Sequence, residues 1–182
     1  MTEFPPAPHT DHSPRHVDPR HPPDDLAPAI TWYEQGRPEQ AEEHCRRILD
    51  AAPDRADAWC LLGVARRAQG RPAGAVKALQ RTLALRPLYP EAYNNLGIAL
   101  FQLDHLASAE DALLSALQLR PGYTLALQNL AILRQARGRF ADALECARQA
   151  AAAAPDEIQP RLDLATFLLA AGHWAEGWSA YE

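Results

Sequence analysis

The chain has 182 residues, a formal net charge of −5 and 47% hydrophobic residues. Lys77 is its only lysine, and this acidic balance lacks the basic stripe of a nucleic-acid binder, so we exclude nucleic acid as a partner. No apolar run approaches the roughly 20 residues that a membrane span needs, which argues against a membrane association. Arginine supplies the other basic residues beside abundant Ala, Leu and Pro, a composition typical of bacterial proteins from GC-rich genomes.

The cysteines and the first residues indicate in which cellular compartment the protein is found. Cys45, Cys60 and Cys146 form no CxxC spacing, and an odd number of cysteines suits a reducing environment better than a disulfide framework. The stretch that starts at Met1 has neither the basic nor the apolar region of a secretory signal. We therefore expect a cytoplasmic protein.

Residues 1–23 differ in composition from the rest of the chain. Prolines are dense there and prevent a regular helix, so we expect a disordered Pro/His-rich tail. The tail carries four of the seven histidines, namely His9, His12, His16 and His21. We interpret them as part of a solvated tail, with loose metal binding as the alternative.

Beyond the tail, a 34-residue period organises the chain. The motif Trp59-Cys60-Leu61-Leu62-Gly63 recurs as Tyr93-Asn94-Asn95-Leu96-Gly97, and Pro53, Pro87, Pro121 and Pro155 follow the same spacing. Tyr93, Leu96, Gly97 and Leu100 occupy one face of a helix at i, i+3, i+4 and i+7. Such self-similarity is the signature of a helical solenoid. The repeats fall at 22–55, 56–89, 90–123, 124–157 and, as a partial unit, 158–182.

Each repeat is expected to hold two antiparallel helices joined by a tight turn. Gly36, Gly70, Gly138 and Gly172 fall at the turn, where a positive φ costs glycine little, and Asp104 takes this place in the third repeat. Alanine recurs where the paired helices approach closely, at Ala41, Ala75, Ala109 and Ala143. The first helix of the first repeat is expected to begin late, near Leu26.

These motifs (aromatic, Leu, Gly, then Ala, a bulky residue, Ala and Pro) resemble the tetratricopeptide repeat family over residues 22–182. The resemblance implies an all-α, right-handed superhelical solenoid of antiparallel helix pairs. It also implies a concave surface, lined by the first helix of each repeat, that takes peptides or partner helices.

Two asparagines stand out on the expected concave surface. Asn95 points roughly 160° away from the apolar stripe of its helix, and Asn129 follows one repeat later, with Asp163 continuing the row. This row resembles the asparagine ladder of the peptide-glycosylating, sugar-transferring members of the family, in which side-chain amides bind a peptide backbone. The alternative is that the helices merely tolerate solvent-facing asparagines.

The other candidate groove residues give a mixed polar and apolar lining. They are Asp57, Glu91, Ile98, Gln102, Gln128 and Ile132. Val64, Ile98 and Ile132 stand where a carboxylate clamp would need a polar residue, so we do not expect such a clamp.

We find no catalytic or metal motif and expect no cofactor. His44 and Cys45 are adjacent on a helix and point about 100° apart, which favours ordinary packing over a nucleophile–base pair. His105 and His173 fall at turns. The carboxylate pairs Glu42-Glu43 and Glu110-Asp111 are expected on exposed helix faces.

The last segment is expected to leave several large apolar residues partly uncovered. They are Leu164, Phe167, Leu168, Trp174, Trp178 and Tyr181. This edge suggests either a longer protein or self-association through Trp174 and Trp178.

The residues 172–182 are similar to the last repeat of bacterial tetratricopeptide proteins that continue into a glycosyltransferase domain. We expect a scaffold that binds a protein or peptide, and the alternative is the substrate-recruiting part of a protein glycosyltransferase.

Overall fold

The computed structural model describes residues 25–181, which form ten α-helices and no strand. The predicted tail and its histidines lie outside the described residues. The helices are Ala27–Glu34 (α1), Pro38–Ala51 (α2), Ala56–Ala68 (α3), Pro72–Leu85 (α4), Pro90–Gln102 (α5), Leu106–Leu119 (α6), Thr124–Ala136 (α7), Phe140–Ala153 (α8), Ile158–Ala170 (α9) and Trp174–Tyr181 (α10).

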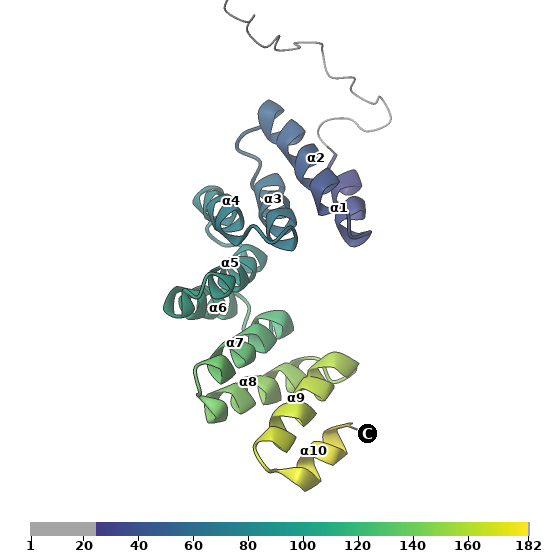
Figure 1. Ribbon diagram of the computed structural model, residues 1–182, viewed down its shortest axis with the longest axis vertical. Coiled ribbons are helices and arrows are strands. Elements are labelled where there is room, and N and C mark those ends of the chain that lie inside the picture. The colour runs from purple at the N-terminus through teal and green to yellow at the C-terminus, as the bar shows by residue number, and fades with distance from the viewer. Residues whose placement is uncertain (1–24, 182) are drawn as a thin grey trace, which may run out of the picture.

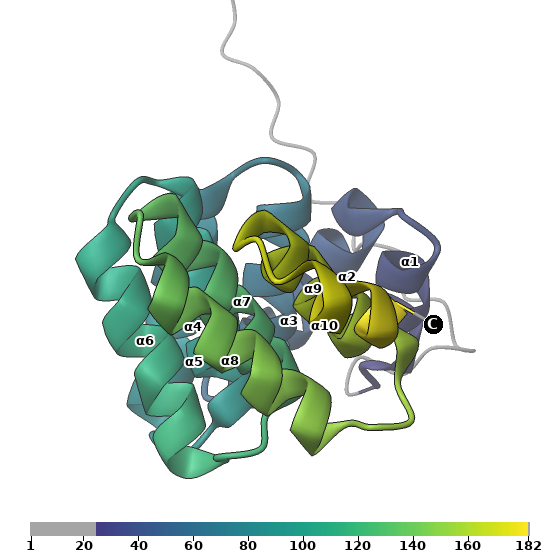
Figure 2. The same ribbon diagram turned by 90° about the horizontal axis from the view of Figure 1, so that it is seen from below.

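The helices form antiparallel pairs that stack in chain order along the long axis of the molecule (Figure 1). The array also curves: seen from below, α1–α2 and α9–α10 lie on the same side, although they are at opposite ends of the long axis (Figure 2). Each helix contacts mainly its neighbours in the chain. This is the predicted all-α solenoid.

Turn residues explain where the helices end. Gly36, Gly70, Gly138 and Gly172 have φ between 69° and 82°, and Asp104 has φ 61°, as expected for the turn within each pair. A proline directly follows the last residue of α2, α4, α6 and α8 and its C-cap, where a helix cannot continue. The first helix begins at Ala27, one residue after the predicted Leu26.

The core lies between the helices of each pair and between successive pairs. Ala41, Ala75, Ala109 and Ala143 are all fully buried, so the predicted close approach of paired helices is confirmed. At the same interfaces, a Cβ added to Gly97 would stand 2.7 Å from Cγ of Leu113, which shows how tightly α5 and α6 pack. Within residues 25–181, no helix combines the length and apolarity that crossing a bilayer requires.

Candidate functional site

The odd-numbered helices form the inner row of the curved array. Each contacts the next odd-numbered helix directly, from α1 to α9, whereas the even-numbered helices in the described part of the chain make no such contact with one another. The array therefore bends around the odd-numbered helices, and we call the surface that they line the groove.

A row of β-branched residues runs along the groove, one from each successive repeat. Ile30 and Ile132 are 44% and 49% exposed, and Val64 and Ile98 between them are half-buried. Their 34-residue spacing places them at the same position of α1, α3, α5 and α7. The groove therefore carries an apolar stripe, with one side chain from each of these four helices.

The two predicted asparagines lie beside this stripe, but their amides are held differently. Asn95 is half-buried, and its Nδ2 donates to the backbone oxygen of Glu91 in its own helix at 2.9 Å. Asn129 donates instead across the repeat boundary, to Oδ1 of Asn94 at 2.9 Å. Each amide is thus oriented by one hydrogen bond and keeps a carbonyl oxygen for a ligand.

Asn94 was not among the predicted site residues. It is only 4% exposed, and its position corresponds to Cys60 in the preceding repeat. A polar residue at the position of Cys60 was the available signal, because a buried amide needs a hydrogen-bond partner.

A second bond between repeats involves two predicted residues. Gln128 on α7 donates to Oδ2 of Asp163 on α9 at 2.6 Å, and Gln159 donates to Oδ1 of the same carboxylate at 2.8 Å. Gln128 and Asp163 therefore lie together, beside Asn129 and Ile132 of α7. Amide donors hold this carboxylate, and among the described residues it has no cationic partner.

The other two acidic groove residues have cationic partners. Asp57 accepts from Arg55 at 3.1 Å and also from the backbone N–H of Ala58 at the start of α3. Glu91 pairs with Arg120, whose guanidinium lies 4.8 Å from the ring centre of Tyr123. Gln102 is exposed at the last turn of α5, whereas Glu91 lies in the first turn of the same helix.

A pocket opens into the groove between α7, α8 and α9. It has a volume of about 190 Å³ and is lined by Gln128, Ala131, Ile132, Gln135, Ala147, Asp163, Thr166 and Phe167. Three of these lining residues, Gln128, Ile132 and Asp163, were predicted groove residues, and the other five were not. Only the tertiary packing of the three helices brings them together.

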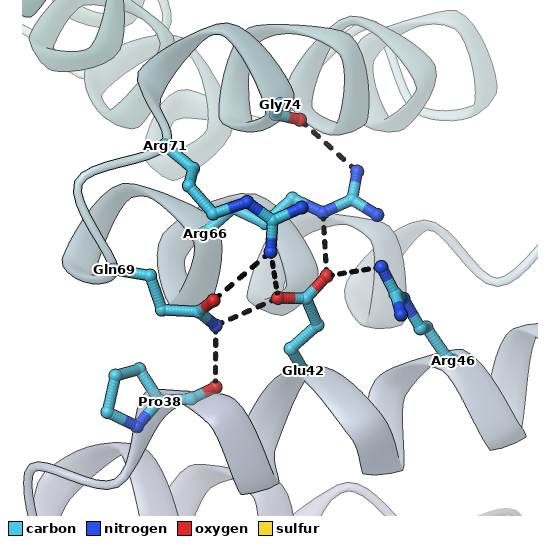
Figure 3. Close-up of polar contacts among 7 residues, drawn as sticks. All are labelled: Pro38, Glu42, Arg46, Arg66, Gln69, Arg71 and Gly74. Atoms are coloured by element: carbon cyan, nitrogen blue, oxygen red, sulfur yellow. Dashed lines mark hydrogen bonds and ion pairs between the residues drawn. The ribbon is translucent and has the colours of Figure 1, made fainter.

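The prediction that Glu42 and Glu110 lie on exposed faces is wrong. Glu42 is 5% exposed, and its carboxylate accepts from Arg66 at 3.1 Å, Arg71 at 2.8 Å and Gln69 at 2.8 Å (Figure 3). Arg46 completes this set from the same helix. The carboxylate lies at the joint between two repeats, where the next pair of helices covers it.

Glu110 repeats this arrangement two repeats later. It is 8% exposed and pairs with Arg134, Arg137 and Arg139. Burial alone would raise the pKa of both carboxyls, but the surrounding donors and charges outweigh it and lower both values. These glutamates are structural ion-pair centres and do not point into the groove.

The remaining titratable candidates also have structural roles. His44 is buried, its Nε2 lies 2.7 Å from the backbone oxygen of Asp25, and its ring meets Trp32 edge-on. Burial raises the pKa of Cys45 to about 12 and that of Cys60 to about 11, so neither thiol is an activated nucleophile. His105 and His173 lie in turns, as expected. No group of three or more metal-ligating side chains occurs between residues 25 and 181.

The C-terminal edge is exposed in part. Trp174, Trp178 and Tyr181 are 63%, 57% and 59% exposed, whereas Leu168 is only 3% exposed. The expectation that Leu168 remains uncovered is wrong, because α10 folds back and packs on α9. Leu164 and Phe167 of α9 are half-buried, and the three largely exposed residues of this edge belong to α10.

Comparisons with known proteins agree with this geometry. Models of the tetratricopeptide repeat match residues 29–76 and 60–124, and a related one matches residues 126–159. No curated protein sequence matches the chain.

Several solved structures share the fold. A MamA crystal structure has a TM-score of 0.70 at 24% identity and covers 84% of this chain and 90% of that one. Pseudomonas aeruginosa PilF has a TM-score of 0.77 at 23% identity, over 86% of this chain and 71% of that one. TTC0263, a thermophilic tetratricopeptide protein of Thermus thermophilus, has a TM-score of 0.75 at 23% identity, over 86% of both chains. Since the family models cover more than half of its length, the chain belongs to the tetratricopeptide repeat family.

Proposed function

We propose that the groove binds an extended segment of a partner protein, whose backbone is held by Asn95 and Asn129. The tetratricopeptide fold itself makes the chain a protein-interaction scaffold, and the groove is the surface where its odd-numbered helices meet. On this proposal the solenoid of residues 24–182 is the binding unit.

One observation carries the proposal: both amides are already oriented beside an apolar stripe. Hydrogen bonds to Glu91 and Asn94 hold Asn95 and Asn129, so a ligand meets amides that need little reordering. Each retains acceptor capacity, and a side-chain amide can bind a main chain of any sequence. The stripe of Ile30, Val64, Ile98 and Ile132 supplies apolar contact for the side chains of the segment.

The spacing of the groove fits an extended chain. Neighbouring packed helices lie roughly 8–10 Å apart, and an extended peptide advances about 3.3 Å per residue. Every third residue of the segment would therefore meet the next groove helix. The groove thus favours segments with apolar residues three positions apart.

A random dodecapeptide library displayed on phage tests the proposal. Selected peptides are synthesised and their affinity is measured by fluorescence anisotropy against the wild-type protein and the N95A/N129A variant. We expect the variant to bind at least about tenfold more weakly, since each lost hydrogen bond costs roughly 1 kcal/mol.

The control carries Gln80→Ala and Gln118→Ala, which remove two exposed amides from α4 and α6. It should bind as the wild type does. The proposal fails if the N95A/N129A variant binds the selected peptides within twofold of the wild-type affinity. It also fails if the library yields only peptides whose binding does not change in this variant.

A second candidate function is self-association through α10. Its support is the exposure of Trp174 and Trp178, which place large apolar area on one short helix. Sedimentation velocity from low to high micromolar concentration would show a growing dimer fraction, and Trp174→Ser/Trp178→Ser would remove it. A wild-type monomer at every concentration excludes this function.

The enzyme alternative rests on the resemblance of residues 172–182 to repeats that precede a bacterial glycosyltransferase domain. In that case the groove would recruit the protein substrate. The intact mass of the endogenous protein decides: a mass near 20.0 kDa contradicts the alternative. We also propose a cytoplasmic location, which the three free, buried cysteines favour.

A further inference from the structure

The pocket between α7, α8 and α9 lies where the fourth repeat lacks the glycine–leucine packing pair of the second and third repeats. In the second and third repeats, Gly63 and Gly97 allow Leu79 and Leu113 to pack against the helix backbone, and an added Cβ would lie 2.7 Å from the leucine Cγ. The fourth repeat has Ala131 in place of the glycine and Ala147 in place of the leucine.

This exchange removes more side-chain carbon than it adds, so α7 and α8 fill less of the space below the pocket. Leucine to alanine loses most of a side chain, whereas glycine to alanine gains a single methyl group. Ala131 and Ala147 are both about 1% exposed to solvent yet line the pocket. The two alanines therefore lie beneath the pocket, and the more exposed side chains around them form its accessible walls.

The size and walls of the pocket suit one large apolar side chain. Its volume is about 190 Å³, and an apolar protein cavity of about 150 Å³ is large enough to bind benzene. Ile132 and Phe167 form apolar walls above the two alanines. The polar residues on the lining come from α7 and α9 and are Gln128, Gln135, Asp163 and Thr166.

The charge at this rim is unbalanced. Asp163 accepts hydrogen bonds from Gln128 and Gln159, which are neutral, and it forms no ion pair within residues 25–181. Asp57 and Glu91, the other acidic groove residues, are each paired with an arginine. A cation from the ligand would therefore be attracted to Asp163 and not to the other two.

We infer that this pocket is a specificity subsite for an aromatic or large aliphatic side chain that stands next to a lysine or arginine in the bound segment. The apolar group fills the space over Ala131 and Ala147, and the cation pairs with the Asp163 carboxylate that Gln128 and Gln159 orient. As a statement about which partner segments bind, the inference rests on the proposed function of the groove. The pocket itself can be tested without a peptide.

The probe is 2-phenylethylammonium, which joins an aromatic ring to a cation. Its binding to the full chain is followed by NMR through the ¹³C-labelled alanine methyl groups, among them those of Ala131 and Ala147, two of the residues that line the pocket. Phenylacetate has the same ring with the opposite charge, and ethylammonium has the charge without a ring. We expect 2-phenylethylammonium to shift both methyl signals and to bind about three to five times more tightly than phenylacetate.

Two variants separate the two parts of the inference. Asp163→Asn should reduce the preference for the ammonium probe to about equal binding, whereas Asp111→Asn, on an exposed face of α6, should leave it unchanged. The double variant Ala131→Gly/Ala147→Leu copies the packing of Gly97 and Leu113, and should fold while abolishing binding of both aromatic probes.

Three results would overturn the inference. They are unshifted Ala131 and Ala147 signals up to the solubility limit of the probe, equal binding of phenylacetate, and unchanged binding in the double variant. Failure of the groove is distinguishable: peptides that depend on Asn95 and Asn129 but ignore the pocket leave the proposed function intact. If the probe binds but no such peptides are found, the pocket is supported and the proposed function of the groove is rejected.

Discussion

Glu42 and Glu110 stand two repeats apart, and each is buried against arginines that follow it by 24 and 29 residues. At the intervening joint, Val76 takes the place of the glutamate, and Leu100 packs against the same apolar cluster in the place of Arg66. The joints of the solenoid thus alternate between ionic and apolar, with a period of two repeats. Because repeat arrays are stabilised by nearest-neighbour interfaces, this alternation determines how each joint responds to mutation and pH.

Removing the Glu42 charge should destabilise the protein. Glu42→Gln leaves Arg66 and Arg71 without their counter-charge, and we expect a loss of about 2 kcal/mol, less than for a fully buried pair because Arg71 is half exposed. Urea unfolding followed by circular dichroism measures it. Glu43→Gln, on the exposed side of the same helix, should change stability by less than about 0.5 kcal/mol. Equal effects of the two substitutions would contradict a structural role for the Glu42 cluster.

Converting the whole ionic joint into the apolar type should be tolerated. The variant Glu42→Val/Arg66→Leu/Gln69→Leu/Arg71→His copies the residues that stand 34 positions later. Replacing a buried ion cluster by well-packed apolar groups is often neutral or stabilising, so we expect a stability within about 1 kcal/mol of the wild type, or higher. A loss larger than that of Glu42→Gln would show that the two joint types are not interchangeable.

Acid should weaken the ionic joints. The pKa values of Glu42 and Glu110 are lowered in the folded state, so the unfolded chain takes up protons first as the pH falls. Their contribution to stability is complete above the ordinary value of 4.5 and is lost as the pH passes through the lowered folded values. Unfolding free energies between pH 7 and pH 3 should fall less steeply for Glu42→Gln/Glu110→Gln than for the wild type. Identical slopes would assign acid sensitivity to other carboxylates.

A methyl group on Gly97 should disturb the packing of α5 on α6. The added Cβ would stand 2.7 Å from Cγ of the buried Leu113 and 3.1 Å from the backbone oxygen of Ala109, and we expect Gly97→Ala to cost about 1–3 kcal/mol. Gly122→Ala is the control, since its nearest neighbour is the Cβ of Ala153 at 4.0 Å. Thermal unfolding compares them, and a Gly97→Ala protein as stable as the control would refute the close packing.

The three thiols should be unreactive in the folded protein. Burial raises the pKa of Cys45 to about 12 and of Cys60 to about 11, and it also raises that of Cys146. At pH 8 we expect Ellman's reagent to label the native protein slowly and to titrate all three cysteines at once in guanidinium chloride. Rapid labelling of one thiol without denaturant would identify an accessible cysteine and contradict this environment.

The sequence by itself determined the periodic features of the fold. The 34-residue spacing, the turn glycines such as Gly70 with φ 69°, and the buried alanines such as Ala75 all follow from local rules. A turn residue needs a permitted φ, and a close helix pair needs a small side chain, whatever lies beyond the repeat. The positions of Asn95 and Asn129 on the inner helices were accessible in the same way, because helix periodicity gives the direction of a side chain.

Only the tertiary structure decided which residues meet across the repeat boundaries. The burial of Glu42 by the next repeat, the bond from Asn129 to Asn94, and the pocket over Ala131 and Ala147 all join residues on different helices. Their partners are set by how the helices stack and how far each side chain reaches. A period identifies equivalent positions but does not carry this information, so a charged residue that looks solvated on its own helix can lie at the centre of a joint.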